Sequence, residues 1–208
     1  MELSHNTTHT TPSASRVFLF FGVVGAGKGT QITLLQEHFA SQGIMSHYLY
    51  PGNFFREVSK RTDRTADRIR AILDQGELVP DFITNAYITN YAVHNYVGDE
   101  YIILDGYPRS IEQARAVVEL CNFYGWDQID IITIDISEAE AVQRLLARGR
   151  HDDTPEAIAQ RVHVYKDRVV PALQYVVDHI PCRTHVINGE QSIQDVQADI
   201  FKVLGISQ

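Results

Sequence analysis

The sequence is poor in cysteine and in long apolar runs, and each shortage excludes a class of protein. Two cysteines, Cys121 and Cys182, cannot form a disulfide framework or a four-thiolate zinc site, so both are predicted to be packing residues and no zinc is expected. No apolar run approaches the length of a membrane span, and the first fifteen residues carry Ser, Thr, His and Asn in place of an apolar signal core. We therefore expect a cytoplasmic protein without membrane contacts, with a disordered tail over residues 1–15.

Basic residues are also outnumbered, because the sequence has 8 more acidic residues than basic ones. The bulk surface should therefore attract neither nucleic acid nor an anionic membrane, and any anion site must be a local concentration of positive charge. Only four of the 18 basic residues are lysines, and the other fourteen are arginines. Arginine grips phosphate oxygens with a fork of donors, although solvated ion pairs would explain the same bias.

An apolar run, a glycine-rich loop and a lysine follow one another near the start of the chain. The run Val17–Phe21 predicts a strand buried on both faces of a parallel sheet, and the segment GVVGAGKGTQ after it leads into a helical pattern. A loop that wraps phosphates needs glycine dihedrals to turn its N–H groups inward. Lys28 then stands where its ammonium can reach the phosphates. The context predicts a P-loop rather than a turn with an accidental lysine, although Gly29 separates Lys28 from Thr30.

Four further apolar segments predict the remaining strands of one sheet. They span residues 44–50, 101–105, 129–136 and 185–187. Helical patterns alternate with them, including one from Asp81 to about Val97 and a long one from Pro155 that Pro171 should bend. The alternation predicts an α/β fold with a five-stranded parallel sheet and helices on both faces.

Two polar residues near the third predicted strand have a structural and a functional interpretation. Asp105 stands at the carboxyl end of the strand, where ligands gather in open α/β sheets, so it is a candidate for holding magnesium directly or through water. The alternative is an ordinary turn aspartate. Gln113 follows Ser110 at the spacing of a capping box, so the alternative for Gln113 is a helix-cap partner.

Four motifs, taken in order, resemble those of adenylate kinases and their relatives, the nucleoside monophosphate kinases. They are GAGKGTQ, then GELVP at residues 76–80, DGYPR at 105–109 and RHDD at 150–153. The resemblance covers nearly all of the chain after the tail, and the joint occurrence of the motifs is more specific than any one of them. It implies a P-loop kinase fold with a core domain, a helical monophosphate-binding insertion and a short lid. The implied boundaries are 16–52, 79–147 and 155–208 for the core, 53–78 for the insertion and 148–154 for the lid.

The resemblance also implies roles for individual residues. ATP would be bound by Gly25, Ala26, Gly27, Lys28, Gly29, Thr30, Arg144 and Arg148. AMP would be bound by Gly52, Arg56, Glu77, Leu78, Val79, Gly106, Arg109 and Gln113. The catalytic residues would be Lys28, Arg109, Arg148, Arg150 and Arg161, while Thr30 and Asp105 would hold Mg²⁺, partly through water. For each arginine the structural alternative is a surface ion pair.

The sequence departs from the family pattern in three places. Val23 and Val24 replace prolines that are common in the loop, which should change its stiffness more than its chemistry. Pro51 and Asn53 stand where threonine and aspartate are usual, so a hydroxyl near the base and a carboxylate near the magnesium are missing. The lid is shorter than even the short forms of the family and has no cysteines for zinc.

The activity that the resemblance implies is that of an adenylate kinase, which transfers a phosphoryl group reversibly from MgATP to AMP and yields two ADP. The expected partners are ATP, AMP and ADP, the cofactor is Mg²⁺, and a monomer is expected. One alternative is a kinase of the same fold that acts on UMP, CMP or another monophosphate, which Pro51 favours. Another is a nucleotide-binding regulator with little turnover, which Asn53 and the short lid favour.

Overall fold

The structure, a computed structural model, describes residues 15–149 and 153–207. Residues 1–14, 150–152 and 208 lie outside it, and among them is Arg150 of the expected catalytic set. Ser15, which the sequence analysis assigned to the tail, instead belongs to the folded part. Its side chain is buried and donates a hydrogen bond to the carbonyl oxygen of Gly98 at 3.0 Å. No helix in the described ranges is long and apolar enough to cross a membrane.

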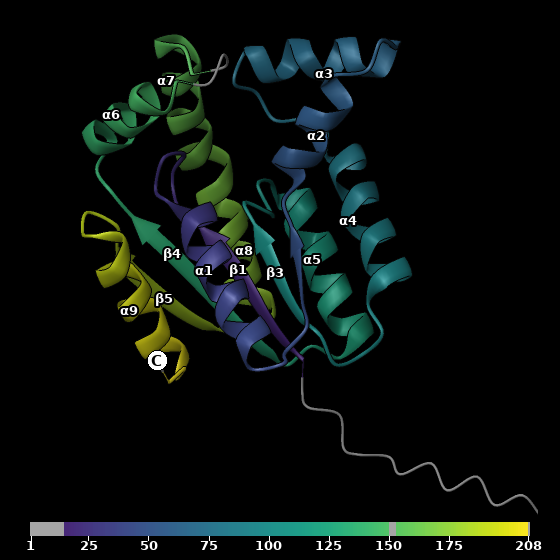
Figure 1. The fold of residues 1–208 in the computed structure, drawn as a ribbon. Coiled ribbons are helices and arrows are strands. Elements are labelled where there is room, and N and C mark those ends of the chain that lie inside the picture. Colours follow the sequence, from purple (N-terminus) through teal and green to yellow (C-terminus); the bar gives the residue numbers. More distant parts are fainter. Residues whose placement is uncertain (1–14, 150–152, 208) are drawn as a thin grey trace, which may run out of the picture.

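A single parallel sheet forms the centre of the described chain (Figure 1). Its strands are β1 (Arg16–Phe21), β2 (Ser46–Leu49), β3 (Tyr101–Asp105), β4 (Gln128–Asp135) and β5 (Arg183–Asn188). The order is β2-β3-β1-β4-β5, and all neighbours run parallel, as the sequence predicted. Phe20 of β1 stands opposite Asp105 of β3. The loops that follow these two strands therefore leave the same edge of the sheet next to each other.

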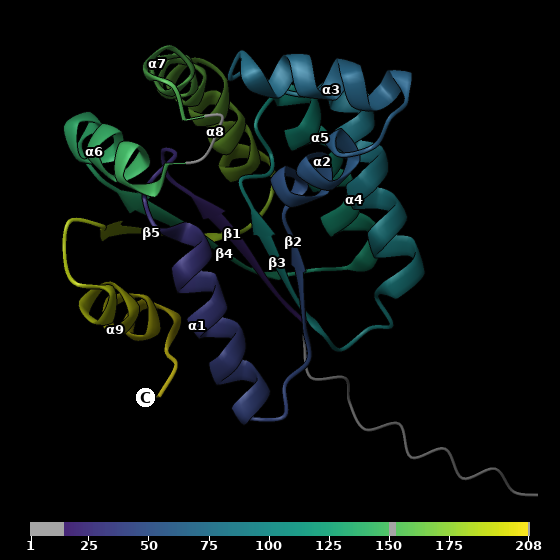
Figure 2. The same ribbon diagram turned by 45° about the horizontal axis from the view of Figure 1, so that its top comes forward.

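Helices cover both faces of this sheet (Figure 2). The helix bounds are α1 (Lys28–Ser41), α2 (Pro51–Ser59), α3 (Arg64–Asp74), α4 (Asp81–Asn95), α5 (Ile111–Tyr124), α6 (Glu138–Arg148), α7 (Pro155–Val164), α8 (Val170–His179) and α9 (Ile193–Leu204). On one face lie α1 and α9, and on the other lie α4, α5 and α8.

The two faces explain why β1 is an unbroken apolar run. Val17 and Phe21 point into the core under α4, α5 and α8, whereas Phe18 and Phe20 point into the core under α1 and α9. Because successive side chains of a strand face opposite ways, a central strand must be apolar at every position. Cys121 is buried in the first of these cores, as expected of a packing residue.

The long helix predicted from Pro155 is divided by a wider helical turn. A π-helical turn, η1 (Tyr165–Val169), joins α7 to α8, and Pro171 lies in the first turn of α8. Proline has no N–H to donate to the carbonyl four residues earlier, which here belongs to Asp167 inside η1. The irregularity therefore lies in the turn before Pro171 rather than at the proline itself.

The helices α2 and α3 form a small unit of their own beyond the carboxyl edge of the sheet (Figures 1 and 2). Phe55, Val58 and Ile69 are its buried core, together with Val79 after the unit. Asp63 begins α3 by accepting hydrogen bonds from the backbone N–H groups of the next turn. This unit, which spans residues 51–74, overlaps residues 53–78, for which the resemblance implied a monophosphate-binding insertion, and across from it lie α6 and α7.

Candidate active site

One large cavity lies at the carboxyl edge of the sheet, with a volume of about 650 Å³. It is lined by the loops after β1 and β3, by α2 and the end of the α2–α3 unit, and by α6 and α7. Every predicted site residue in the described part of the chain lines this cavity except Ala26, whose side chain is buried in the core under α1 and α9. The sequence therefore predicted which residues converge, and the fold brings them together from separate elements.

The glycine loop after β1 follows a backbone path that requires glycine at particular positions. Gly22 has a φ of 140°, and a Cβ there would lie 2.4 Å from the carbonyl oxygen of Ile134. Gly27 directly precedes α1 with a φ of 91°, and no side chain caps the helix there. The first N–H groups of α1 thus have no capping side chain, and they stand at the cavity wall. Such a helix start is an anion-binding feature.

The Lys28 side chain lies along this loop. Its ammonium donates to the carbonyl oxygen of Gly22 at 2.8 Å and to that of Val23 at 3.3 Å. Burial is the main cause that lowers the pKa of Lys28; Asp105 acts in the opposite direction, and Arg109 lowers the pKa further. An ammonium has three donors, so one remains for a phosphate oxygen while the other two hold the loop.

Asp105 is buried at the end of β3 and uses only one of its carboxylate oxygens. Its Oδ2 accepts a hydrogen bond from the Tyr48 hydroxyl at 2.8 Å, while its buried Oδ1 has no hydrogen-bond partner among the described residues. Thr30 lines the same cavity. In the described ranges no cluster of three His, Cys, Asp or Glu side chains could hold a metal ion. One available carboxylate oxygen fits a magnesium ion that is otherwise held by nucleotide phosphates and water.

Two arginines approach the cavity from the side of α2 and β3. Arg56 donates to the Oδ1 atom of Asn53 at 2.7 Å, and its guanidinium carbon lies 5.2 Å from the centre of the Tyr50 ring. Arg109 donates from Nε to the carbonyl oxygen of Gly106 at 2.5 Å. Both partners are neutral oxygen atoms, so the charge of each guanidinium is not cancelled by the group that holds it.

Gln113 makes different contacts from those of a capping box. Its backbone N–H donates to the Ser110 hydroxyl at 3.2 Å, which is half of the box. Its side-chain Oε1, however, accepts from the backbone N–H of Arg109 at 2.8 Å, and its Nε2 donates to Asp81 at 2.8 Å. The reciprocal bond to the Ser110 N–H is therefore replaced by two contacts that fix the orientation of the amide. Asp81 was missed by the sequence analysis, because only the fold brings it to Gln113.

Two arginines, one from α6 and one from α7, share one buried carboxylate. Arg148, the last residue of α6, binds Asp153 through both Nε and Nη2, at 2.9 and 2.7 Å. Arg161 of α7 donates to the same carboxylate at 3.0 Å. Asp153 is the second functional candidate that the sequence analysis missed, although it stands in the RHDD motif. The sequence did carry a signal for it, because an acidic residue beside arginines of a motif either pairs with those arginines or repels phosphate.

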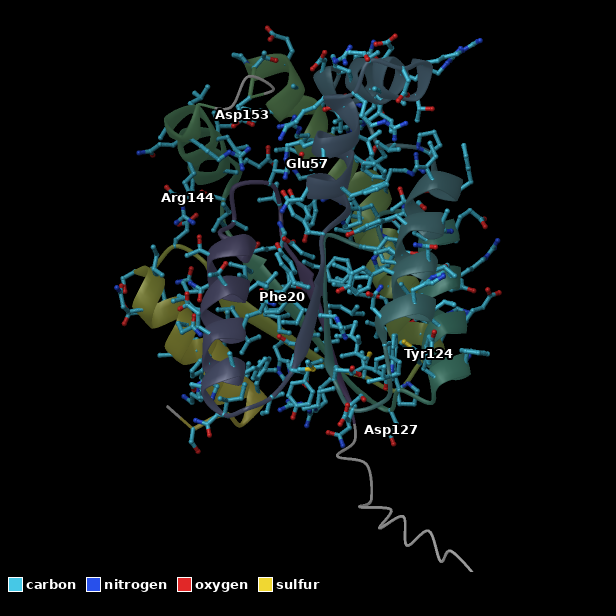
Figure 3. All side chains as sticks on the ribbon, turned by 45° about the vertical axis from the view of Figure 1, so that its right-hand side comes forward. Phe20, Glu57, Tyr124, Asp127, Arg144 and Asp153 are labelled. Carbon is cyan, nitrogen blue, oxygen red and sulfur yellow. The ribbon has the colours of Figure 1, made fainter. Side chains whose placement is uncertain are left out.

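Arg144 lines the cavity but is held by neighbouring groups. Its Nε donates to Glu140 at 2.6 Å and its Nη2 to the carbonyl oxygen of Gly189 at 2.9 Å. Arg144 and Asp153 lie on the α6 and α7 side of the molecule, and Glu57 lies on α2 opposite them (Figure 3). The two sides meet where Gln160 of α7 donates to the Glu77 carboxylate at 2.7 Å. Because Arg144 pairs with Glu140, the surface ion pair that was the structural alternative for each arginine describes Arg144 in this structure.

A glycine loop with its lysine, an uncapped helix start and an arginine-lined cavity define the class of P-loop nucleotide-binding proteins. The family model described as adenylate kinase matches residues 20–180. Adenylate kinase 1 of Nostoc sp. is 33% identical over 187 residues, which cover 90% of this chain and 97% of the relative. Adenylate kinase of Mycobacterium tuberculosis is 33% identical over 90% of this chain and 98% of its own length. That of Prochlorococcus marinus is 34% identical over 88% of this chain and 94% of its own length.

These similarities extend over nearly the whole chain and over nearly the whole of each relative. The chain belongs to the adenylate kinase family of nucleoside monophosphate kinases.

Proposed function

We propose that this protein transfers a phosphoryl group reversibly from MgATP to AMP and produces two ADP. The observation that carries the proposal is that one cavity of about 650 Å³ is lined both by Lys28 and Thr30 of the glycine loop and by Arg56 and Arg109. Phosphoryl transfer needs two substrates held in line and the spread negative charge offset, with little covalent help from the protein. One space lined by cations from both sides supplies these requirements.

The donor triphosphate would lie on the glycine loop. The backbone N–H groups at the start of α1 and the free donor of Lys28 would bind its phosphate oxygens. Asp105 and Thr30 would hold magnesium, partly through water, and the ion would offset charge on the phosphates of ATP. On the other side, Arg56 and Arg109 would bind the phosphate of the acceptor. Arg148 and Arg161 would then reach the transferring group from the lid.

Closure of the lid over the substrates would exclude water, which competes with the monophosphate as phosphoryl acceptor. The shared contact of Arg148 and Arg161 with Asp153 supports this role, because it couples the end of α6 to α7. The two arginines would move with one another when phosphate draws them inward. A monomer and a cytoplasmic location remain predictions from the sequence.

The contacts of Gln113 support a base whose Watson–Crick edge presents an exocyclic amine beside a ring nitrogen that accepts a hydrogen bond. Asp81 only accepts hydrogen bonds and the Arg109 N–H only donates, so the amide of Gln113 has one orientation. Its remaining acceptor and donor match the amine and the ring nitrogen of adenine. Cytosine presents the same pair, whereas uracil and guanine present it reversed. The family assignment then favours AMP over CMP.

A coupled assay with MgATP and each of AMP, CMP, UMP and GMP tests the proposal. We expect AMP to be the best acceptor and UMP and GMP to be poor ones. A strong preference for a non-adenine acceptor would refute the AMP assignment and leave a related monophosphate kinase. If the protein binds ATP but forms no ADP with AMP, CMP, UMP or GMP, it is instead a regulator with little turnover.

A further inference from the structure

Tyr50 is a cavity-lining residue that the motifs of the chain do not account for. It stands between β2 and α2, directly before Pro51, with φ −126° and ψ 97°. A residue before proline is restricted to extended backbone, so Pro51 helps to fix the backbone from which the Tyr50 ring projects. The ring lies nearly parallel to that of Tyr48, with 6.2 Å between ring centres.

The hydroxyl end of the Tyr50 ring lies over Gly52. A Cβ on Gly52 would stand 2.7 Å from the Cζ atom and 2.8 Å from the hydroxyl oxygen of Tyr50. Both residues line the cavity, and Arg56 lies over the ring with its guanidinium carbon 5.2 Å from the ring centre. The phenol is therefore packed at the acceptor side of the cavity, between the start of α2 and the cavity space.

The charges around the phenol are those that the proposed function assigns to phosphate binding. Burial raises the pKa of Tyr50, but Arg109 and Arg56 outweigh burial and lower the pKa below its ordinary value. Asp105 acts in the opposite direction, and Tyr50 is also among the groups that influence the pKa of Lys28. Tyr50, Arg56 and Arg109 line the same cavity, and Arg56 lies over the Tyr50 ring, so the phenol stands on the side of the cavity where the two guanidinium groups would hold a phosphate.

We propose that the Tyr50 hydroxyl is an additional ligand of the acceptor's phosphate and donates a hydrogen bond to an oxygen held by Arg56 and Arg109. The inference rests on the proposed function, because it takes these arginines as the binding site for the acceptor phosphate. Tyr48 does not share the role, since its hydroxyl donates to Asp105. A neutral donor on the same side of the cavity as the two guanidinium groups adds a phosphate contact without adding charge.

Tyr50→Phe tests the inference, because phenylalanine keeps the ring over Gly52 and beneath Arg56 while it removes the hydroxyl. AMP and adenosine are titrated by calorimetry into the wild type and the variant. We expect the Kd of AMP to rise about tenfold, as for the loss of one hydrogen bond to a charged group, and the Kd of adenosine to change less than about twofold. In steady-state assays the KM for AMP should rise while the KM for ATP stays within about twofold.

The matched control is Tyr124→Phe. Tyr124 is a half-buried tyrosine on α5 that packs against Trp126, far from the end of the molecule where Asp153 lies (Figure 3). This variant should bind AMP and adenosine as the wild type does. Thermal denaturation of both variants shows whether each is folded.

The pH dependence separates a phosphate ligand from a packing residue. Above its pKa the phenol becomes a phenolate, which cannot donate and repels phosphate, so the KM of the wild type for AMP should rise on the alkaline side. The charged and titratable groups around it are Lys28, Tyr48, Arg56, Asp105 and Arg109, and they are the same in both proteins. The KM of Tyr50→Phe for AMP should therefore rise less on the alkaline side than the KM of the wild type does.

Two results would overturn the inference. If Tyr50→Phe binds AMP with the affinity of the wild type, the hydroxyl is not a ligand. If it binds AMP more tightly, the phenol competes with phosphate for the arginines. In either case a wild type that still transfers phosphate to AMP leaves the proposed function standing. A wild type that uses no monophosphate refutes the proposed function, and this inference with it.

Discussion

The two sides of the cavity hold their arginines in different ways. On the lid side, Arg148 and Arg161 share the buried carboxylate of Asp153, and Arg144 pairs with Glu140. On the acceptor side, Arg56 and Arg109 bind an amide oxygen and a backbone carbonyl. No carboxylate of the described residues lies within 4.0 Å of either acceptor-side guanidinium. The lid arginines are paired with carboxylates where they stand, whereas the acceptor arginines are held by neutral oxygen atoms.

This difference indicates what each side does when phosphate arrives. A phosphate that reaches Arg56 and Arg109 gains two cations without separating an ion pair, so this side is organised before the substrate binds. A phosphate that reaches Arg148 must compete with Asp153 or share the arginine with it. The lid side is therefore the part that has to rearrange. Asn53 contributes to the difference, because the aspartate usual in the family would place a carboxylate beside Arg56.

The largest loss of activity is expected for Lys28→Ala, because Lys28 lies close enough to the arginines of both sides to be influenced by them. Its pKa is influenced by Arg109 from the acceptor side and by Arg148 from the lid side. Loss of a cation directed at the transferring phosphates should lower kcat by about a thousandfold, as for loss of an oxyanion-stabilising donor. A coupled ADP assay measures the change. Lys60→Ala is the matched control, because Lys60 forms an exposed pair with Glu57 and should keep full activity. Full activity of Lys28→Ala would remove the glycine loop from the mechanism.

Arg109→Ala should break the acceptor side. The variant loses one of two charged phosphate ligands, each of which contributes about 1.5–3 kcal/mol as a charge-assisted hydrogen bond. The KM for AMP should therefore rise by about one to two orders of magnitude, while the KM for ATP changes little. Steady-state kinetics with each substrate varied in turn separates the two constants. Arg115→Ala, which removes an exposed pair with Glu112 on α5, serves as control. Equal losses for both substrates would contradict the division into two sides.

Asp153→Asn should disturb the lid side with a smaller effect. Asparagine cannot accept the two bonds from Arg148 and also hold Arg161 by charge, so both arginines lose part of their positioning. We expect kcat to fall about tenfold while the KM for AMP stays within about twofold. Asp67→Asn tests for non-specific effects, because Asp67 forms only an exposed pair with Arg70. An unchanged kcat would show that the shared carboxylate does not position these arginines for transfer.

The sequence predicted the fold well because the fold rests on local signals. The apolar run of β1, the glycine loop and the acid at the end of β3 each carry their own pattern, and parallel strands must end at one edge. The segment 101–105 is a strand over the predicted residues, whereas β2 is shorter than 44–50 and β5 longer than 185–187. Edge strands have one neighbour, so their ends depend on packing that no local pattern encodes.

The site was predicted less completely, because its partners come from distant elements. Motif positions identified Arg109, Arg148 and Gln113, but not what holds them. The bond between Asp81 and Gln113 joins residues 32 positions apart, and that between Tyr48 and Asp105 joins residues 57 positions apart. Such contacts arise only after the chain has folded. The π-helical turn was likewise unpredicted, since Pro171 indicated a bend but not the wider turn before it.

Asn53→Asp should make the acceptor side resemble the lid side. The Asn53 Oδ1 lies 2.7 Å from Arg56 Nη2, so an aspartate there would form an ion pair with this arginine. Even an exposed pair would offset part of the charge that attracts phosphate, and the KM for AMP should rise about threefold. Asn90→Asp, on the exposed surface of α4, controls for added negative charge. A rise in kcat with an unchanged KM would contradict this account and point to magnesium as the group that residue 53 serves.

A third set of paired charges lies at the amino ends of the strands, away from both sides of the cavity. Changes to this set should affect the stability of the fold and leave phosphoryl transfer unchanged. Asp130 is fully buried and lies 2.8 Å from Arg16, 2.7 Å from Arg183 and 2.9 Å from His185. Burial raises the pKa of Asp130, but its bonds to Arg183, His185 and Arg16 outweigh burial and lower the pKa below the ordinary value. A carboxyl whose folded pKa is depressed stabilises the fold above its unfolded pKa of about 3.9, and this stability is lost as the pH falls through the folded value.

The Tm of Asp130→Asn should therefore lie below that of the wild type at pH 7, and the difference should shrink in acid. Asp127→Asn, an exposed residue at the same end of the molecule (Figure 3), should show no such convergence. A Tm difference that stays constant from pH 7 to below the unfolded pKa would mean that the charge of Asp130 does not stabilise the fold.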